Sequence, residues 1–438
     1  MLPLFDNINY LHANAKNVVF PDPASPEDFT YTLNFLRSYT GSIGTFNSYR
    51  REVERLLQWC WRINNTSLSE LRREDIEQYV RFCQNPPINW IGLKKVPRFI
   101  GKDNKRSPNP EWKPFVVTLS KSKSHAMRRE GCKPRVFDYT MSQGSLQVTF
   151  AILSTFFNFL VTEQYLSSNP IVLIRQKSKY FRKHQQSRPI RRLTPIQWQA
   201  VLDSVDQIEN KTIIWKERTR FILSLFFGLY LRISEVTASV RWTPLMNHFT
   251  KDSEGNWWFT TVGKGNKERQ IAVSDAVLNS LMRWRAFLGL TSVPSLGDTT
   301  PLIPKIRGFG AMSDTSPIRR LVQTCFDKAA ELLSLTHPEE SEGLREVTVH
   351  WLRHTAISED AKTRPLNHVR DDAGHQSIST TNRYINTLHT ERHESAKHKT
   401  IIPNQSLSTE SGGKAVDKNL SSMLIAQIDS LNQMLNAI

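Results

Sequence analysis

The feature that most constrains the fold is the stretch 174–192, IRQKSKYFRKHQQSRPIRR, which holds eight Lys and Arg residues and no acid. Such a composition is typical of a linker, and an extended basic linker can follow a phosphate backbone. The chain has 438 residues, which is more than a usual single domain contains. We therefore expect two domains, one on each side of this linker, with appendages.

The region before the linker, residues 26–173, follows an N-terminal extension at 1–25 and is predicted to be helical. Phe46, Leu56 and Cys60 belong to an apolar set that recurs at helical spacing. The stretches SLSELRREDIEQYVRFC and SLQVTFAILSTFFNFLVTEQYLSSNP predict further amphipathic helices. Their aromatic side chains are expected to form a core.

An insert at residues 85–136 interrupts this helical pattern. It carries 13 Lys and Arg residues and three acids, with Pro, Gly and Trp interspersed. We expect it to be too polar to bury a core. It is then either a solvated loop or a loop that contacts DNA.

The region after the linker, residues 193–402, is predicted to combine helices with a small antiparallel sheet. Thr194 can cap a helix and Pro195 suits its first position. RFILSLFFGLY predicts an apolar helix, and NWWFTTV, GKGNKER and QIAV predict a strand, a turn and a strand. Helices are expected from about residue 276 to 390, so the fold class is mainly α with a small antiparallel β-sheet.

The tail differs from both regions. Residues 403–418 are predicted to be a flexible polar linker. Residues 419–438 predict an amphipathic helix whose apolar residues are spaced four, three, four and three apart, which gives a narrow seam. That seam packs on its own chain or on another subunit, and the Gly-rich linker before it favours another subunit.

The charge of the chain points to nucleic acid. Lys and Arg total 58 against 41 acids, a net charge of +17 with a pI near 9.8, although a merely soluble basic protein is the plainer alternative. No run of 18 apolar residues predicts a membrane span, and the N-terminus has no signal pattern. The four scattered cysteines are expected to be reduced thiols of a cytoplasmic protein.

The stretch VTVHWLRHTAISE, residues 347–359, suggests either a metal or an anion site. His350 and His354 are four apart, but Trp351 stands where a helical zinc motif needs a glutamate, and no Cys cluster lies nearby. Arg353 between them would repel a dication. A guanidinium beside a histidine instead suits an oxyanion, because it can fork onto two phosphate oxygens. We expect no metal and no cofactor.

Four short motifs extend this anion site. They are GLYLRISEV, VGKGNKER, HWLRHT and AGHQSISTTNRY, and they resemble, in order, the sequence boxes of the tyrosine recombinases, the phage-integrase family. The resemblance covers about residues 26–400, and the first region is similar to the helical, SAM-like core-binding domain of that family. The positions that match the catalytic residues of the family are Arg232, Lys264, His350, Arg353, His375 and Tyr384.

The resemblance implies a mechanism of phosphoryl transfer, which depends mostly on positioning and on stabilising charge. Arg232 and Arg353 would clamp the nonbridging oxygens, and His375 would add a hydrogen bond. Tyr384 would attack phosphorus and form a covalent 3′-phosphotyrosine. A tyrosine pKa is ordinarily about 10, so the nucleophile needs help to lose its proton.

Two further roles complete the implied mechanism. His350 is placed to assist the tyrosine, and Lys264 would protonate the departing 5′ oxygen. Plainer alternatives are that Arg232 only pairs with Glu235 and that Lys264 is an exposed turn lysine. Glu235 is predicted to be structural, and His354 is expected to pack or hydrogen-bond inside the domain.

One departure from the family pattern concerns the residues before Gly374. Asp371, Asp372 and Ala373 stand where the family usually has an apolar run with a leucine. We expect the packing that positions His375 to differ, or the site to assemble only on DNA.

The sequence therefore predicts a site-specific integrase of a mobile element that acts on double-stranded DNA. The resemblance implies four protomers on two DNA sites. The apolar seam of the terminal helix is a candidate contact between them, accessory proteins are possible partners, and no membrane is expected to be involved. The other classes to be considered are a DNA-binding partner that no longer cuts, a type IB topoisomerase and, more distantly, a metal-dependent nuclease.

Overall fold

A computed structural model describes residues 1–11, 25–102, 106–172, 174, 191–263, 265–382, 384 and 396–397. Several predicted features lie outside these residues. They are Lys264, most of the basic linker, the polar linker at 403–418 and the terminal helix at 419–438. The predicted domain boundaries stay predictions. Two hydrophobic clusters share no residue, one built from residues 4–174 and the other from residues 193–352.

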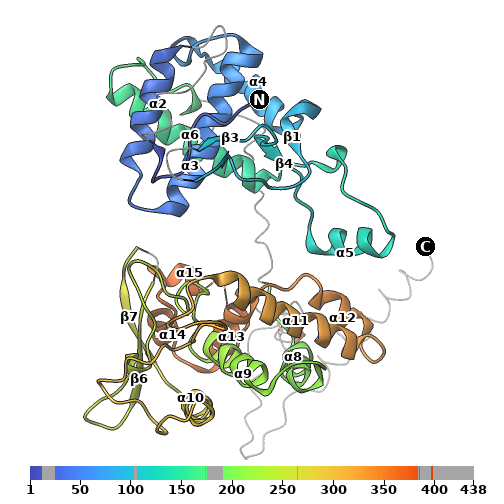
Figure 1. Cartoon of the computed structure of the whole chain (residues 1–438), viewed down its shortest axis with the longest axis vertical. Coiled ribbons are helices and arrows are strands. Elements are labelled where there is room, and N and C mark those ends of the chain that lie inside the picture. The colour runs from blue at the N-terminus through green and yellow to red at the C-terminus, as the bar shows by residue number, and fades with distance from the viewer. Residues whose placement is uncertain are drawn as a thin grey trace, which may run out of the picture. The chain divides into compact units, whose positions relative to one another are not determined.

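The N-terminal region, residues 1–174, is helical as predicted. Its longer helices are α2 (Pro26–Ser38), α3 (Ile43–Trp59), α4 (Arg73–Gln84) and α6 (Gln143–Thr162), and α3 continues into a π-helical turn at Cys60–Asn64. Serine side chains cap three of the four helices, because Ser25, Ser42 and Ser142 each accept a hydrogen bond from a backbone N–H of the first turn. Helices α2, α3 and α6 lie together in this region (Figure 1). Phe35 of α2 stacks on Tyr49 of α3 and contacts Phe156 of α6.

The insert at 85–136 corrects one prediction, because it folds and buries aromatic side chains. β1 (Ile91–Gly92) pairs parallel with β4 (Phe115–Val116), and β2 (Phe99–Ile100) pairs antiparallel with β3 (Ser107–Pro108), before α5 (Lys121–Arg129). Trp90 and Phe115 are buried in the N-terminal cluster, and Trp112 is also buried. The expectation failed because the average polarity of the insert hides its few large apolar residues.

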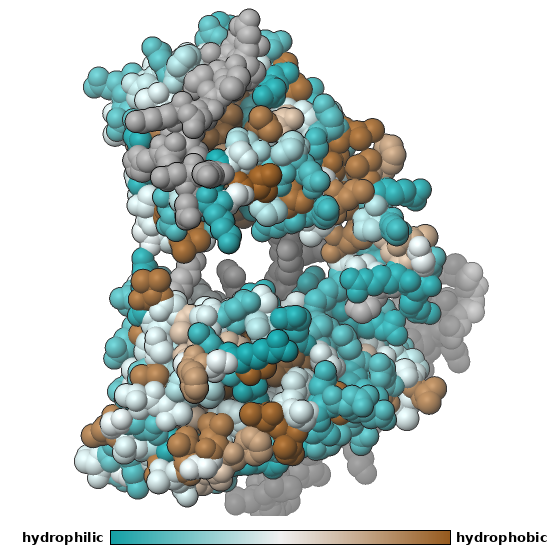
Figure 2. Space-filling view, viewed as in Figure 1, coloured by the Kyte–Doolittle hydropathy of each residue, from teal (hydrophilic) through white to brown (hydrophobic). Residues whose placement is uncertain are grey.

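Helix α6 is the one helix of the described residues that is long and apolar enough to cross a membrane. Half of its apolar window is buried, and Phe150, Leu153, Phe156 and Leu160 belong to the N-terminal cluster. Its apolarity therefore has an explanation in core packing. Hydrophilic residues cover much of the face of the molecule that Figure 2 shows.

The C-terminal region, residues 191–384, confirms the predicted fold class of helices with a small antiparallel sheet. The sheet has the order β5-β6-β7, from β5 (Phe249–Lys251), β6 (Trp257–Val262) and β7 (Glu268–Ala272). The longer helices are α8 (Pro195–Gln207), α9 (Ile213–Gly228), α10 (Asp275–Phe287) and α11 (Thr315–Leu333). The remaining helices are α12 (Pro338–Leu344), α13 (Val349–Thr363), α14 (Leu366–Ala373) and α15 (Ile378–Asn382).

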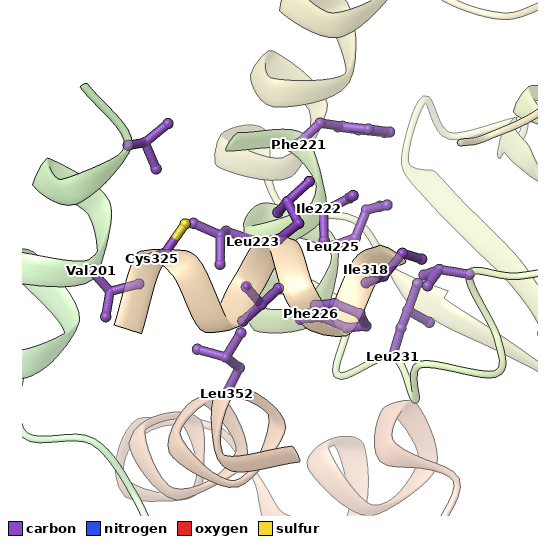
Figure 3. Packing of buried hydrophobic residues seen from close by; sticks show 14 of the residues in the cluster. Val201, Phe221, Ile222, Leu223, Leu225, Phe226, Leu231, Ile318, Cys325 and Leu352 are labelled. Atoms are coloured by element: carbon purple, nitrogen blue, oxygen red, sulfur yellow. The ribbon is translucent and has the colours of Figure 1, made fainter. Parts of the chain in front are cut away.

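Helix α11 lies at the centre of the C-terminal core. Its apolar residues recur at Ile318, Val322, Cys325 and Ala329, so that one face meets the neighbouring helices (Figure 3). Val201 of α8, Phe226 of α9 and Leu352 of α13 belong to the same cluster. Full burial of one such side chain contributes about 1.5–3 kcal/mol, so these contacts fix α13 against the core.

Candidate active site

Helix α13 presents the first group of candidate residues. Arg353 and His354 follow His350 by three and four positions, which places each of them one turn after His350 on the same side of the helix. Leu352 is buried in the main core, and Ala356 and Ile357 are buried in a smaller cluster with Tyr230 and Tyr384. The apolar residues of α13 thus anchor the helix, while its polar residues line the site.

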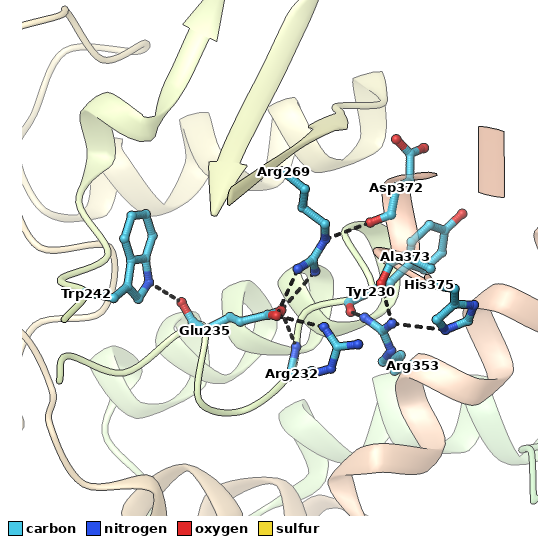
Figure 4. A network of polar contacts seen from close by, with 9 residues as sticks. All are labelled: Tyr230, Arg232, Glu235, Trp242, Arg269, Arg353, Asp372, Ala373 and His375. Atoms are coloured by element: carbon cyan, nitrogen blue, oxygen red, sulfur yellow. Dashed lines mark hydrogen bonds and ion pairs between the residues drawn. The ribbon is translucent and has the colours of Figure 1, made fainter. Parts of the chain in front are cut away.

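Arg353 is held by backbone carbonyls. Its guanidinium donates to the carbonyl oxygen of Tyr230 and, over 2.5 Å, to that of Ala373 (Figure 4). The same Nη2 lies 3.3 Å from Nε2 of His375. The residue is only 2% exposed, and burial together with the charge of Arg232 lowers the pKa of Arg353 to about 9. Two carbonyl dipoles therefore orient a cation that stays charged at neutral pH.

Arg232 belongs to a triad of charges around a buried carboxylate. Glu235 is 1% exposed and accepts from Nη1 of Arg232 at 2.9 Å and from both Nη atoms of Arg269 at 2.9 Å (Figure 4). Burial alone would raise the pKa of Glu235, but the hydrogen bonds and charge of Arg269 and Arg232 lower it. The predicted Arg232–Glu235 pair is present, and it orients the guanidinium of Arg232, whose side chain is 30% exposed.

Two glycines allow Arg269 to reach this triad. A Cβ on Gly374 would lie 2.8 Å from Cδ of Arg269, and Gly374 has a φ of +64° at the end of α14. A Cβ on Gly263 would lie 3.1 Å from both Nη1 of Arg269 and Oε1 of Glu235. Arg269, on β7, also donates from Nε to the carbonyl oxygen of Asp372 at 3.0 Å. The β-sheet and the turn before His375 are therefore joined through one side chain.

His375 and Tyr384 lie beside Arg353. The ring of His375 stacks on Tyr384 with centroids 5.6 Å apart, and its Nδ1 is 2.9 Å from the hydroxyl of Thr381. Tyr384 is 8% exposed. Burial and the charges of Arg353, Arg232 and Arg269 lower the pKa of His375 to about 4. The imidazole is therefore neutral at physiological pH, with Nε2 directed at the arginine.

The two histidines of α13 also contact each other. The rings of His350 and His354 lie 4.2 Å apart edge to face, and His354 lies 5.3 Å from the ring of Tyr384. Desolvation, and then the charges of nearby His350 and Arg353, lower the pKa of His354 to about 4, while desolvation and Arg353 lower that of His350. Within the described ranges no group of three metal-ligating side chains occurs.

Asp372, one of the two acids before Gly374, belongs to a polar network. Asp372 is buried, accepts from Arg364 at 2.5 Å, and accepts from the backbone N–H of Ala272 on β7 at 3.3 Å. Arg364 also donates to the hydroxyl of Tyr230, which in turn donates to Asp360. Asp372 thus ties the segment before His375 to β7 and to Arg364.

This network reaches the backbone that holds Arg353. Tyr230 has a φ of +50°, which is uncommon for a residue with a Cβ, and its carbonyl is the one that Arg353 contacts. Its side chain is tied to α13 and, through Arg364, to α14. Hydrogen bonds at both ends thus fix the loop that precedes Arg232.

Five of the six predicted site residues are close together in the structure, namely Arg232, His350, Arg353, His375 and Tyr384. Lys264 lies outside the described residues. The sequence did not reveal Arg269 or Asp372 as parts of the site. For Arg269 a signal existed, because residues two apart in a strand share a face, and Arg269 lies two positions before the apolar Ile271, which is buried.

Comparisons with known proteins agree with the family resemblance. Residues 191–391 match the model described as the phage integrase family. The tyrosine recombinase XerD of Rickettsia conorii is 24% identical over 242 residues, which cover 55% of this chain and 72% of that protein. XerD of Staphylococcus epidermidis is 25% identical over 255 residues, which cover 58% and 75%.

Two solved structures are also reported, both with a TM-score below 0.5. The XerH site-specific recombinase bound to a palindromic difH substrate has a TM-score of 0.47 at 14% identity, covering 87% of this chain and 91% of that chain. A lambda integrase dimer bound to a COC′ core site has a TM-score of 0.45 at 10% identity, covering 89% and 80%.

Proposed function

We propose that this chain, whose residues 191–391 match the phage integrase family, is a site-specific DNA recombinase that works through a covalent 3′-phosphotyrosine. The observation that carries the proposal is the convergence of Arg353, His375 and Tyr384. The guanidinium is 3.3 Å from the imidazole, and the imidazole stacks on the phenol. The triad around Glu235 brings Arg232 to the same site.

The two arginines have the geometry for a phosphate clamp. Each guanidinium is oriented by a partner on one side, Arg232 by Glu235 and Arg353 by two carbonyls. The remaining N–H groups can then donate to the nonbridging oxygens of a phosphodiester, whose negative charge grows in the transition state. In the neutral tautomer whose Nδ1 accepts from the hydroxyl of Thr381, His375 would supply a third donor from Nε2 to the phosphate.

The chemical step exchanges one ester for another. The phenol oxygen of Tyr384 forms a bond to phosphorus as the bond from phosphorus to the 5′ oxygen breaks. His350 takes the phenolic proton, and Lys264 protonates the leaving 5′ oxygen. A 5′ hydroxyl from a second strand then attacks the phosphotyrosine and releases the phenol. The energy of the bond is retained, so the cycle consumes no nucleotide.

The proposal also includes the assembly of the protein on DNA and the biological context in which it acts. Four protomers would hold two duplex sites, with the helix at 419–438 contributing a contact between subunits, and the chain would act in the cytoplasm for a mobile genetic element. Removal of residues 419–438 is expected to leave cleavage intact and to abolish tetramers on DNA, as measured by mass photometry. Tetramers that persist would exclude this role for the helix.

Covalent trapping tests the proposal. The protein is mixed with a nicked duplex that carries its recombination site, in EDTA, and denatured products are separated. We expect a protein–DNA adduct that disappears in Tyr384→Phe and persists in Tyr49→Phe, which removes a hydroxyl in the N-terminal region. An adduct that survives Tyr384→Phe would reject the nucleophile. Binding without an adduct would instead indicate a partner that no longer cuts.

A further inference from the structure

Arg364 lies between the end of α13 and the start of α14. It follows the last residue of α13 and precedes Pro365, and a proline disfavours helical backbone in the residue before it. Its backbone N–H donates to the carbonyl oxygen of Asp360 at 2.7 Å, which closes the last turn of α13. Its side chain is one-third exposed and contacts the side chains of Tyr230, Asp360 and Asp372.

The guanidinium of Arg364 joins two residues that are far apart in the sequence. Nη1 donates to the hydroxyl oxygen of Tyr230 at 2.8 Å, and Nη2 donates to Oδ2 of Asp372 at 2.5 Å. Burial and the hydrogen bond to Asp360 raise the pKa of Tyr230, so its hydroxyl stays protonated and donates to Asp360 while it accepts from Arg364. Tyr230 and Asp372 are both buried, and one arginine therefore spans the distance between two buried side chains.

The same two segments supply the carbonyl oxygens that hold Arg353. Nη1 of Arg353 donates to the carbonyl oxygen of Tyr230, and Nη2 donates to that of Ala373, the residue after Asp372. Arg364 thus connects, through side chains, the two backbone positions that Arg353 contacts through its guanidinium. Because Arg353 is buried in a closely packed site, its guanidinium has to follow a shift of either carbonyl.

Each of these backbone positions also precedes another residue of the site. Arg232 follows Tyr230 by two positions, and His375 follows Ala373 by two. Tyr230 has a φ of +50°, and a residue with a Cβ keeps such a conformation only where the surrounding contacts hold it there. Two further donors to the proposed phosphate therefore depend on the backbone positions that Arg364 connects.

We infer that Arg364 is a positioning residue of the active site, because its bridge between Tyr230 and Asp372 sets the spacing of the two carbonyls that orient Arg353. The inference rests on the proposed function for the chemistry that Arg353 performs. A plainer alternative is that Arg364 only neutralises Asp372 and Asp360, which lie 2.5 and 3.4 Å from its guanidinium. Any cation would serve that purpose, whereas the bridge needs two nitrogen atoms in the fixed geometry of a guanidinium.

Single-turnover cleavage tests this inference. Formation of the adduct on the nicked duplex is followed over time at saturating protein. The rate constant then reports the chemical step, whereas the final amount of adduct reports the fraction of active protein. A role in folding alone would lower the final amount, and misplacement of Arg353 would lower the rate constant. Arg364→Ala is expected to lower the rate constant by about 10–100-fold, since a displacement of about 1 Å can cost about 100-fold.

Two further variants make the comparison specific. Arg370→Ala is the matched control, because it removes an exposed arginine of α14 that pairs only with the neighbouring Asp371, at 2.7 Å, among the contacts found in the described residues, and it should keep the parental rate constant. Arg364→Lys keeps a cation opposite Asp372, which protects folding, but one ammonium cannot reproduce the fork. Its rate constant should stay at least about tenfold below that of the parent chain. A parental rate constant in Arg364→Lys would overturn the inference in favour of simple neutralisation, and a parental rate constant in Arg364→Ala would overturn it outright.

A second measurement does not depend on cleavage. The pKa of His375 is about 4 because burial and the charge of Arg353 lower it, so displacement of Arg353 should raise this pKa toward its ordinary value of about 6.5. NMR of histidine-labelled protein follows the titration, and the signal of His375 is assigned by its loss in His375→Gln. The pKa of His375 should rise in Arg364→Ala and stay at the parental value in Arg370→Ala.

The two measurements separate the possible failures. Equal pKa values of His375 in Arg364→Ala and Arg370→Ala would overturn the positioning role. If the parent chain forms no adduct but the pKa of His375 still rises in Arg364→Ala alone, the recombinase proposal fails and the positioning of Arg353 by Arg364 is supported.

Discussion

Gly374 and Gly289 offer a matched test of how the active site is held together. Both follow a helix, α14 and α10 respectively, and both have left-handed backbone, with φ of +64° and +73°. An alanine in this conformation costs about 1–2 kcal/mol from its Cβ alone. Gly289→Ala is expected to show only this cost, because nothing lies within 4 Å of the added atom.

Gly374→Ala adds a second cost. Its Cβ would lie 2.8 Å from Cδ and 3.2 Å from Nε of Arg269, so that side chain must move. Arg269 is the bidentate partner of Glu235, and breaking a buried ion pair costs about 3–5 kcal/mol. We therefore expect Gly374→Ala to lose about 3 kcal/mol more than Gly289→Ala.

Differential scanning calorimetry of the full chain provides the assay. Both glycines lie in the C-terminal region, so the two variants should affect the same transition. A difference of about 3 kcal/mol corresponds to roughly 6–12 °C in the Tm of a domain of about 200 residues. The rate of adduct formation should fall in Gly374→Ala and stay at the parental value in Gly289→Ala. Equal Tm shifts would refute the idea that the close approach of Arg269 matters.

Three further predictions concern charges of the site. Glu235→Gln keeps the shape of the side chain but leaves Arg269 and Arg232 without their counter-charge, so the Tm and the yield of adduct should both fall. An unchanged yield would argue against positioning of Arg232 by this carboxylate. Asp372→Asn should cost about 1–2 kcal/mol by denaturant titration, since Arg364 is one-third exposed and partly screened; a neutral result would mean that the network adds no stability. His354 and His375 have pKa values of about 4 in the folded state, against about 6.5 in the unfolded state. The unfolded state therefore binds more protons, and the Tm should fall as the pH is lowered from 6.5 to 5. A constant or rising Tm would contradict the burial of these rings.

The sequence predicted the residues of the candidate site better than the residues that hold them in position. The order of the motifs identified Arg353 and His375 because the chemistry demands those residue types. Asp372 was recognised only as a departure, since its pairing with Arg364 depends on how α13 and α14 meet. Tyr230 gave no signal, because neither its left-handed backbone nor its contact with Arg353 is encoded in a local pattern.

The helices and the sheet followed from local patterns, whereas the insert did not. Capping residues predicted α8 and apolar spacing predicted α6, because each signal lies within or next to the helix itself. The insert depends on contacts between residues far apart, such as Arg55 with Pro114 and Phe115. Because most residues of the insert are polar, its overall composition did not reveal these few aromatic side chains.

The way in which Arg353 is anchored has a practical consequence for assays. Carbonyl oxygens orient the guanidinium without neutralising it, and within the described part of the chain no carboxylate forms an ion pair with it. Small oxyanions in the buffer should therefore compete with substrate for this position. Rates measured in sulfate or phosphate are expected to fall below those in chloride at equal ionic strength. The identity of the buffer anion, and not only its concentration, therefore has to be fixed before variants are compared.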